Sequence, residues 1–293
     1  MSVKERDPLT GHQTTGHEWN GITELNTRVP RAIWFFIIVT HVWALFYWVL
    51  MPAWPTVNTY TKGLLGVDQR QQVEARVAAA DAKRSSWSDP ITSLTLDEVR
   101  SDPTLMAHVQ RTAPALFGDN CAACHGAQAQ GGPGYPSLVD QAWLWGADDE
   151  TVLETLRVGI NAPHPESRFS QMMAFGRDGL LDREQIRIAA DYVQSLSRPA
   201  EEINADRLAA GATLFEENCA SCHGEDGTGS QDLGAPDLTD EHWIYGGDEK
   251  SIFNTIFHGR QGWMPAWEQR LSETDRRILT IYLGQLKETH HDD

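Results

Sequence analysis

The sequence contains the pattern C-x-x-C-H twice, and this pattern restricts the fold more than any other feature. The first copy is Cys121-Ala122-Ala123-Cys124-His125 and the second is Cys219-Ala220-Ser221-Cys222-His223. Two thiols at this spacing form thioethers with the two vinyl groups of one porphyrin, and the histidine then ligates the iron. The sequence therefore predicts two covalently bound haem c groups. Their attachment residues are Cys121, Cys124, Cys219 and Cys222, and their first iron ligands are His125 and His223.

Other uses of C-x-x-C are a thioredoxin-like redox pair and one half of a zinc site. The two copies lie 98 residues apart, each within a domain-sized stretch of its own, whereas a zinc site needs the pairs close together. No βαβ pattern surrounds either copy. The four cysteines of the chain are all used by the two motifs, so none is left for a disulfide.

The sequence around each motif forms a repeated unit, residues 103–198 and residues 199–293. The motif Leu-Phe-x-x-Asn-Cys, then a tryptophan (Trp143 or Trp243) and a glycine (Gly159 or Gly259) recur in the same order. Each unit ends in an amphipathic stretch, residues 181–196 and 271–286, in which Asp182 with Gln185 and Ser272 with Asp275 resemble capping boxes. We expect a mainly α fold in which each unit closes around its own haem.

The second ligand of each iron is predicted to be a methionine, because Met opposite His raises the reduction potential and suits electron transfer. Met264 precedes the closing helix of the second unit. Aligning Ala174 with Ala266 places Met172 over Met264, and Met173 then stands at the position of Pro265. Met173 and the loop histidine His164 stay open as alternatives. Trp143 and Trp243 either donate to a haem propionate or pack against the porphyrin.

Residues 30–55 are predicted to be a membrane anchor. The 20 residues from Ala32 to Met51 carry no formal charge, and as a helix they span about 30 Å, the thickness of the hydrocarbon layer. A cleaved signal peptide fits poorly, because the stretch is long and lacks a small-x-small cleavage site. Arg28 and Arg31 precede the anchor, which places residues 1–29 in the cytoplasm and the haem units in the bacterial periplasm. His41, in mid-span, needs a polar partner or binds a haem.

Residues 1–29 are expected to form an irregular tail, and residues 56–102 a connector. The connector includes a polar helix over residues 68–84 that ends at residues 85–90, and Asp102 is expected to cap a helix that starts at Pro103. The net charge is −17, and residues 199–293 carry 7 basic against 19 acidic residues. This balance argues against a nucleic-acid partner and favours a basic protein partner, although it also serves solubility.

The N-terminal part resembles one family. Thr15-Gly16-His17-Glu18-Trp19-Asn20-Gly21, then Pro30-Arg31, the apolar stretch and Pro52-Ala53-Trp54-Pro55 are similar to the di-haem subunit (CcoP or FixP) of cbb3-type cytochrome c oxidase. The resemblance covers nearly the whole chain. It implies one transmembrane helix followed by two tandem cytochrome c-like (class I) haem domains, and Met173 departs from the proline usual after the ligand. It further implies a non-catalytic electron-transfer subunit. Such a subunit accepts electrons from a soluble or anchored cytochrome c and passes them to a mono-haem subunit and a haem–copper subunit, which reduces oxygen and pumps protons.

Three other functions stay open at this point. A free-standing anchored di-haem carrier needs no partner subunits, and the cytochrome subunit of a periplasmic dehydrogenase needs different ones. A di-haem peroxidase needs an iron without methionine, whereas each unit here offers a candidate methionine.

Overall fold

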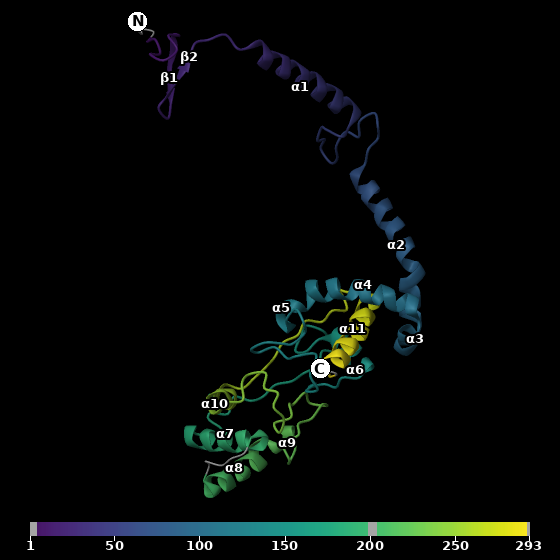
Figure 1. The fold of residues 1–293 in the computed structure, drawn as a ribbon, viewed down its shortest axis with the longest axis vertical. Coiled ribbons are helices and arrows are strands. Elements are labelled where there is room, and N and C mark those ends of the chain that lie inside the picture. Colours follow the sequence, from purple (N-terminus) through teal and green to yellow (C-terminus); the bar gives the residue numbers. More distant parts are fainter. Residues whose placement is uncertain (1–4, 199–203, 292–293) are drawn as a thin grey trace. The chain divides into compact units, whose positions relative to one another are not determined.

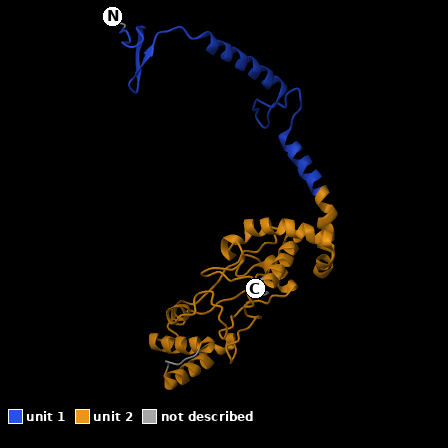
Figure 2. Ribbon diagram, viewed as in Figure 1, with its two compact units in different colours: residues 1–82 blue, residues 83–293 orange. Residues whose placement is uncertain are grey.

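The computed structural model describes residues 5–198 and 204–291, and it divides into two compact units, residues 1–82 and 83–293 (Figure 2). In the first unit lie two strands and an apolar helix: β1 (Thr14–Trp19), β2 (Ile22–Leu25) and α1 (Arg31–Leu50). Helix α2 (Gln69–Ser93) begins in the first unit and ends in the second. The mainly α architecture expected from the sequence is confirmed.

The tail before the anchor contains a β-hairpin, which corrects the expectation of an irregular segment. β1 and β2 pair antiparallel, with Trp19 opposite Ile22. The turn between them is Asn20-Gly21, and both residues have positive φ, 52° and 85°. Asn-Gly is the dipeptide that favours such two-residue turns, because both residues tolerate the left-handed conformation. This dipeptide was the signal for a hairpin in the sequence.

Helix α1 is long and apolar enough to cross a membrane, and none of its residues is buried within the protein. Pro30 immediately precedes it, as suits a helix N-terminus, and the chain turns away at Met51 and Pro52. The Nδ1 atom of His41 lies 2.7 Å from the carbonyl oxygen of Ile37, one turn earlier. This contact within the helix gives His41 a polar partner that requires neither a second helix nor a haem.

Helix α2 runs through the segment that was expected to break it, and Pro90 lies inside the helix. A proline there removes a backbone hydrogen bond, at a cost of about 3 kcal/mol. Two contacts offset this cost: Ile91 is fully buried, and the ring of Trp87 stacks on His108 with centroids 4.9 Å apart. Burial of one such aliphatic side chain contributes about 2 kcal/mol, and an aromatic stack adds to it. Tertiary packing therefore outweighs the local signal.

The second unit consists of helices joined by irregular loops (Figure 1). These helices are α3 (Leu96–Ser101), α4 (Pro103–Asn120), α5 (Ala122–His125), α6 (Asp149–Val158), α7 (Arg183–Ser197), α8 (Ala205–Asn218), α9 (Ala220–His223), α10 (Glu249–His258) and α11 (Glu273–His291). Asp102 caps α4 through the backbone N–H groups of Thr104 and Leu105, as expected. Both predicted capping boxes are confirmed: Asp182 with Gln185 at α7, and Ser272 with Asp275 at α11.

The two repeats do not each close their own core, which corrects the sequence expectation. Helix α4 of the first repeat packs against α11 of the second, and α7 of the first packs against α8 and α10 of the second (Figure 1). Core 1 joins the first half of repeat one to the second half of repeat two: Phe117, Ala129, Val152, Leu156, Trp267, Leu271, Leu279 and Leu283. Core 2 is the reciprocal combination: Phe175, Leu181, Ile186, Ala189, Ala190, Val193, Phe215, Leu238, Ile252 and Ile256.

The exchange has a local cause. Helices α7 and α8 are neighbours in the sequence, with α7 ending at Ser197 and α8 beginning at Ala205. A short connection favours packing between the helices that it joins. Once α7 lies on α8, helix α4 must find its partner in α11. The two closing helices offer equivalent faces for this purpose, since Tyr192 of α7 contacts Phe215 and Tyr282 of α11 contacts Phe117.

Candidate functional site

The four cysteines lie at two one-turn helices, α5 and α9, and all are free thiols. In each motif the histidine N–H donates to the carbonyl of the first cysteine at 3.0 Å, so that the two thiols are one turn apart. Cys121 and Cys219 are half-buried against the cores, whereas Cys124 and Cys222 are exposed. Burial, with a smaller effect of the neighbouring thiol, raises the pKa of Cys121 and of Cys219 to about 11.

The two histidines are oriented in the same way. The Nδ1 atom of His125 lies 3.0 Å from the carbonyl oxygen of Pro136, and that of His223 lies 3.1 Å from the carbonyl oxygen of Pro236. A donor bond at Nδ1 fixes the tautomer and leaves Nε2 as the metal-binding nitrogen. Burial lowers the pKa of both imidazoles, which keeps them neutral, as a metal ligand must be.

The two candidate methionines belong to the exchanged halves. Met264 packs against core 1, together with Cys121 of the first motif. Met172 packs against core 2, together with Cys219 of the second motif. The structure therefore does not bring together the pairs expected within each repeat, Met172 with His125 and Met264 with His223. Each methionine lies beside the motif of the other repeat because the cores are exchanged.

Backbone hydrogen bonds hold each methionine loop where it meets the other repeat. We call these two places the crossings. Met264 exchanges two hydrogen bonds of 2.9 Å with Ile160, and Met172 exchanges bonds of 2.8 and 3.1 Å with Arg260. Just before these partners stand Gly159 and Gly259, both with φ +69°. A Cβ atom at Gly159 would lie 2.5 Å from the carbonyl oxygen of Met264, and one at Gly259 equally close to that of Met172. The recurring glycines admit the methionine loop of the other repeat.

Two buried indole N–H groups bear on whether a haem fits these sites. Trp145 and Trp243 each have a buried Nε1 atom without a partner among the described residues. A buried donor without an acceptor is costly, and haem propionates are acceptors of the required kind. Trp143 differs, since its Nε1 donates to the carbonyl of Asp140 at 2.9 Å. The thiol pairs, the neutral histidines and these donors together fit two covalently attached haems.

Two arginines lie over aromatic rings near the methionine loops and were missed by sequence reasoning. Arg168 stacks on Trp145 at 5.0 Å, and Arg260 stacks on Tyr245 at 4.2 Å. Each also donates to a threonine hydroxyl, Thr155 or Thr255, at the same position of its repeat. The arginines do not align between the repeats, because Arg168 lies in an insertion. The recurring threonines and the aromatic residues Trp145 and Tyr245 were the available signal.

The alternatives to Met172 differ from it in their surroundings. The side chain of Met173 is 53% exposed, whereas Met172 packs against core 2. His164 has both ring nitrogens in contact with protein groups, Nε2 with Glu268 at 3.0 Å and Nδ1 with the N–H of Glu166 at 3.1 Å. Met172 is therefore the candidate that lies against a core, whereas Met173 is exposed and both ring nitrogens of His164 already have protein partners.

Comparison with known proteins finds relatives along the whole chain. Residues 11–58 match the family described as "N-terminal domain of cytochrome oxidase-cbb3, FixP". Residues 111–197 match "Cytochrome c", and residues 206–283 match "Cytochrome C oxidase, cbb3-type, subunit III". The two haem motifs fall within these last two matches, so the chain has two cytochrome c domains and two covalent haem c groups.

Full-length relatives agree with these matches. The cbb3-type cytochrome c oxidase subunit FixP of Bradyrhizobium sp. (strain ORS 278) is 43% identical, covering 96% of this chain and 97% of the relative. The subunit CcoP of Cereibacter sphaeroides is 42% identical, covering 98% and 99%. The subunit CcoP of Azospirillum brasilense is 40% identical, also covering 98% and 99%. The chain therefore belongs to the CcoP/FixP family of cbb3-type cytochrome c oxidase subunits.

Proposed function

We propose that this chain carries electrons as the di-haem subunit of a cbb3-type cytochrome c oxidase. Electrons enter from a donor cytochrome c, pass through the two haems, and continue to the mono-haem subunit and the haem–copper subunit. The observation that supports this most directly is the pair of equivalent sites, each with a thiol pair, an oriented histidine and a half-buried methionine. Bound haem supplies one-electron chemistry at its iron, and the chain supplies ligands on both faces.

We assign the ligands across the repeats: His125 with Met264, and His223 with Met172. The exchanged cores support this assignment, since each methionine packs on the core that holds the other repeat's first cysteine. Methionine opposite histidine raises the potential and closes the iron to outside ligands. Both haems then serve as relays rather than as sites for peroxide or oxygen chemistry.

Contacts between the two sites support transfer within one unit. The N–H of Gly134 donates to the carbonyl of Ile244 at 2.9 Å, and Gln231 reaches the carbonyl of Trp143 at 3.4 Å. His242 lies 3.4 Å from Asp140. Loops that follow the two haem motifs are thus joined directly, which keeps the separation of the haems fixed.

The anchor and the charge distribution support the placement and the partner. Two arginines, Arg28 before α1 and Arg31 at its first position, favour a cytoplasmic N-terminus in the bacterial inner membrane and periplasmic haem sites. The acidic second repeat favours a basic donor, because opposite potentials steer encounter. Oxidation of a basic cytochrome c by the oxidase should slow as salt is raised, and a flat salt profile would reject this docking role.

The ligand assignment is tested by labelling one haem. Replacing only Cys222 by alanine leaves the haem at His223 attached through one thioether with one free vinyl group, which shifts its absorption band. In this background Met172→Ala should lower the potential of the shifted haem, and Met264→Ala that of the unshifted haem. The opposite pattern would restore pairing within each repeat. Purification in mild detergent tests the complex: migration as a lone cytochrome would reject the oxidase role.

A further inference from the structure

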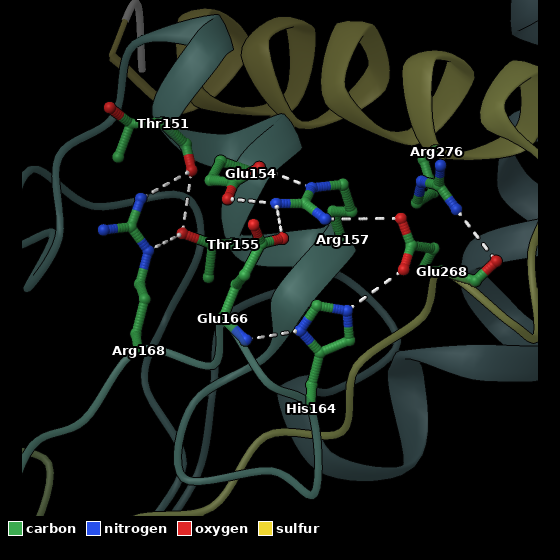
Figure 3. A network of polar contacts seen from close by, with 9 residues as sticks. All are labelled: Thr151, Glu154, Thr155, Arg157, His164, Glu166, Arg168, Glu268 and Arg276. Carbon is green, nitrogen blue, oxygen red and sulfur yellow. Dashed lines mark hydrogen bonds and ion pairs between the residues drawn. The ribbon is translucent and has the colours of Figure 1, made fainter.

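A network of charged side chains lies where the first repeat meets the methionine loop of the second (Figure 3). We call Arg157, His164 and Glu268 the clasp. Arg157, on α6, donates to Glu154 at 2.8 Å, to Glu166 at 2.6 Å and to Glu268 at 3.3 Å. Glu268 is the only member from the second repeat, and it follows the loop that contains Met264. The clasp thus joins residues that are more than a hundred positions apart.

His164 is held as a spacer within the clasp. Its side chain is 8% exposed, and it lies on the insertion, residues 161–169, that has no counterpart in the second repeat. Nδ1 accepts from the N–H of Glu166 at 3.1 Å, so Nε2 carries the proton that is donated to Glu268 at 3.0 Å (Figure 3). Since its own loop sets the ring orientation, His164 defines where the Glu268 carboxylate must lie.

The same insertion and α6 also hold the loop backbone on both sides of Met264. The side-chain amide of Asn161 donates to the carbonyl of Gly262 at 2.6 Å, before the methionine. After the methionine, the N–H of Trp267 donates to Leu156 at 3.0 Å and that of Glu268 to Arg157 at 3.3 Å. Met264 is thus centred in a segment fixed at both ends by the first repeat.

The other crossing lacks these groups. The alignment that pairs Met172 with Met264 places Gly176 at the position of Glu268, and the shared glycines place Phe257 at the position of Arg157. A Cβ atom at Gly176 would lie 2.2 Å from the ring of Phe257, so an aromatic side chain packs directly on backbone there. The clasp is therefore specific to the loop of Met264.

We propose that the clasp positions Met264 on the iron of the haem held by His125. This inference rests on the ligand assignment proposed above. Without the clasp, the loop end after Met264 keeps its backbone bonds but loses its side-chain attachment to α6 and to the insertion. A methionine from a distant part of the chain then spends less time on the iron, which leaves that haem partly five-coordinate. Arg157, His164 and Glu268 are positioning residues, since they act through the loop.

The test uses the full-length chain with both haems in the oxidase and the Cys222→Ala label. In Glu268→Ala we expect the haem at His125 to lose methionine-to-iron charge-transfer absorption, to gain carbon monoxide binding and to fall in potential. The haem at His223 should be unchanged. Glu268→Gln keeps an acceptor for His164 and should give a smaller change in the same direction. The matched control is Glu216→Ala, which removes the same charge from an exposed position of α8.

The outcomes separate this inference from the function on which it rests. If Met264→Ala lowers the potential of the unshifted haem but Glu268→Ala and Arg157→Met do not, the clasp has no positioning role and the ligand assignment stands. If Met264→Ala leaves that haem unchanged, the assignment itself fails. Should Glu268→Ala reduce haem attachment, Arg157→Lys provides a milder variant, and an unchanged carbon monoxide spectrum in it would also overturn the proposal.

Discussion

The two crossings of this protein share a backbone geometry but differ in the side chains that fill it. Phe175 donates to Ile256 at 3.1 Å in one crossing, and Trp267 donates to Leu156 at 3.0 Å in the other. The residues that face each other are Phe257 and Gly176 in the first crossing, and Arg157 and Glu268 in the second. The backbone hydrogen bonds therefore allow the first half of either repeat to meet the second half of either repeat. The side chains favour particular combinations of halves.

This difference selects against the unexchanged arrangement. If each repeat closed on itself, Arg157 would face Gly176 and lose a partner, and Glu268 would face the ring of Phe257. An aromatic ring offers the carboxylate neither a hydrogen-bond donor nor an opposite charge in place of the guanidinium. The exchanged arrangement gives the arginine a carboxylate and the phenylalanine a glycine. This pair of positions therefore adds a preference for the exchanged arrangement to the one that comes from the short connection between α7 and α8.

The largest effect is expected from the crossing glycines. Gly159→Ala should displace the loop of Met264, and Gly259→Ala that of Met172, because a Cβ atom meets the opposite backbone at 2.5 Å. Positive φ adds strain, and the total should be about 3 kcal/mol or more of lost unfolding free energy. Urea unfolding gives the stability, and haem-resolved redox titration with the Cys222→Ala label shows which haem changes.

The glycine variants also test whether the two repeats exchange their halves. Gly159→Ala should affect the haem at His125, to which we assign Met264 of the second repeat. An effect confined to the haem at His223 would mean that the loops and motifs combine differently. Gly179→Ala is a suitable control, because Gly179 also has positive φ but has nothing within 4 Å of an added Cβ.

The next effect concerns the apolar crossing. Phe257→Ala should lower the unfolding free energy by about 2 kcal/mol, less than a fully buried phenylalanine, because the ring is only half-buried. It should also loosen the loop of Met172 and lower the potential of the haem at His223. Phe253→Ala, one turn earlier, is the control: it removes an aromatic that stacks on Phe257 but leaves both members of the crossing pair in place. Equal shifts at both haems would contradict a local role.

Replacing the Arg157–Glu268 pair by the residues of the other crossing tests how much these side chains contribute. Arg157→Phe alone should destabilise core 1, because Glu268 loses its guanidinium partner and meets a ring. Adding Glu268→Gly gives this crossing a phenylalanine against a glycine, as in the other crossing, and should restore part of the lost unfolding free energy. The coupling of the two changes, measured by urea unfolding of the four chains of a double-mutant cycle, should be favourable. Additive effects would mean that the pair does not discriminate between the arrangements.

The sequence predicted the composition of the sites but not their assembly. C-x-x-C-H defines a thiol pair and a histidine through contacts within five residues, and the capping boxes of α7 and α11 are equally local. The exchange of cores is a choice between two closing helices with the same apolar face, and periodicity cannot separate them. The short stretch between Ser197 and Ala205 and the complementary residues Arg157 and Glu268 were the signals for it.

The hairpin and helix α2 both differ from the sequence prediction, but for different physical reasons. Asn20-Gly21 is a local signal for a two-residue turn, and the turn alone is enough to place β1 and β2. Pro90, in contrast, is a local signal that tertiary packing overrides, since Ile91 is buried among residues of α3, α4 and α11. No property of residues 85–90 alone reveals that cluster.

The smallest effect is a pH dependence of the clasp. The bonds from His164 and Arg157 lower the pKa of Glu268 below 4.5, its ordinary value. A carboxylate with a lowered pKa in the folded state stabilises the fold above that ordinary value, and this contribution is lost as pH falls through the lowered pKa. The difference in urea midpoint between the native chain and Glu268→Gln should therefore shrink between neutral pH and pH values below 4.5. Glu154 and Glu166 also face Arg157, and His164 contacts Glu268; all three are present in both chains, so the comparison isolates Glu268. A difference that does not shrink as the pH falls below 4.5 would show that Glu268 does not act as a carboxylate in the clasp.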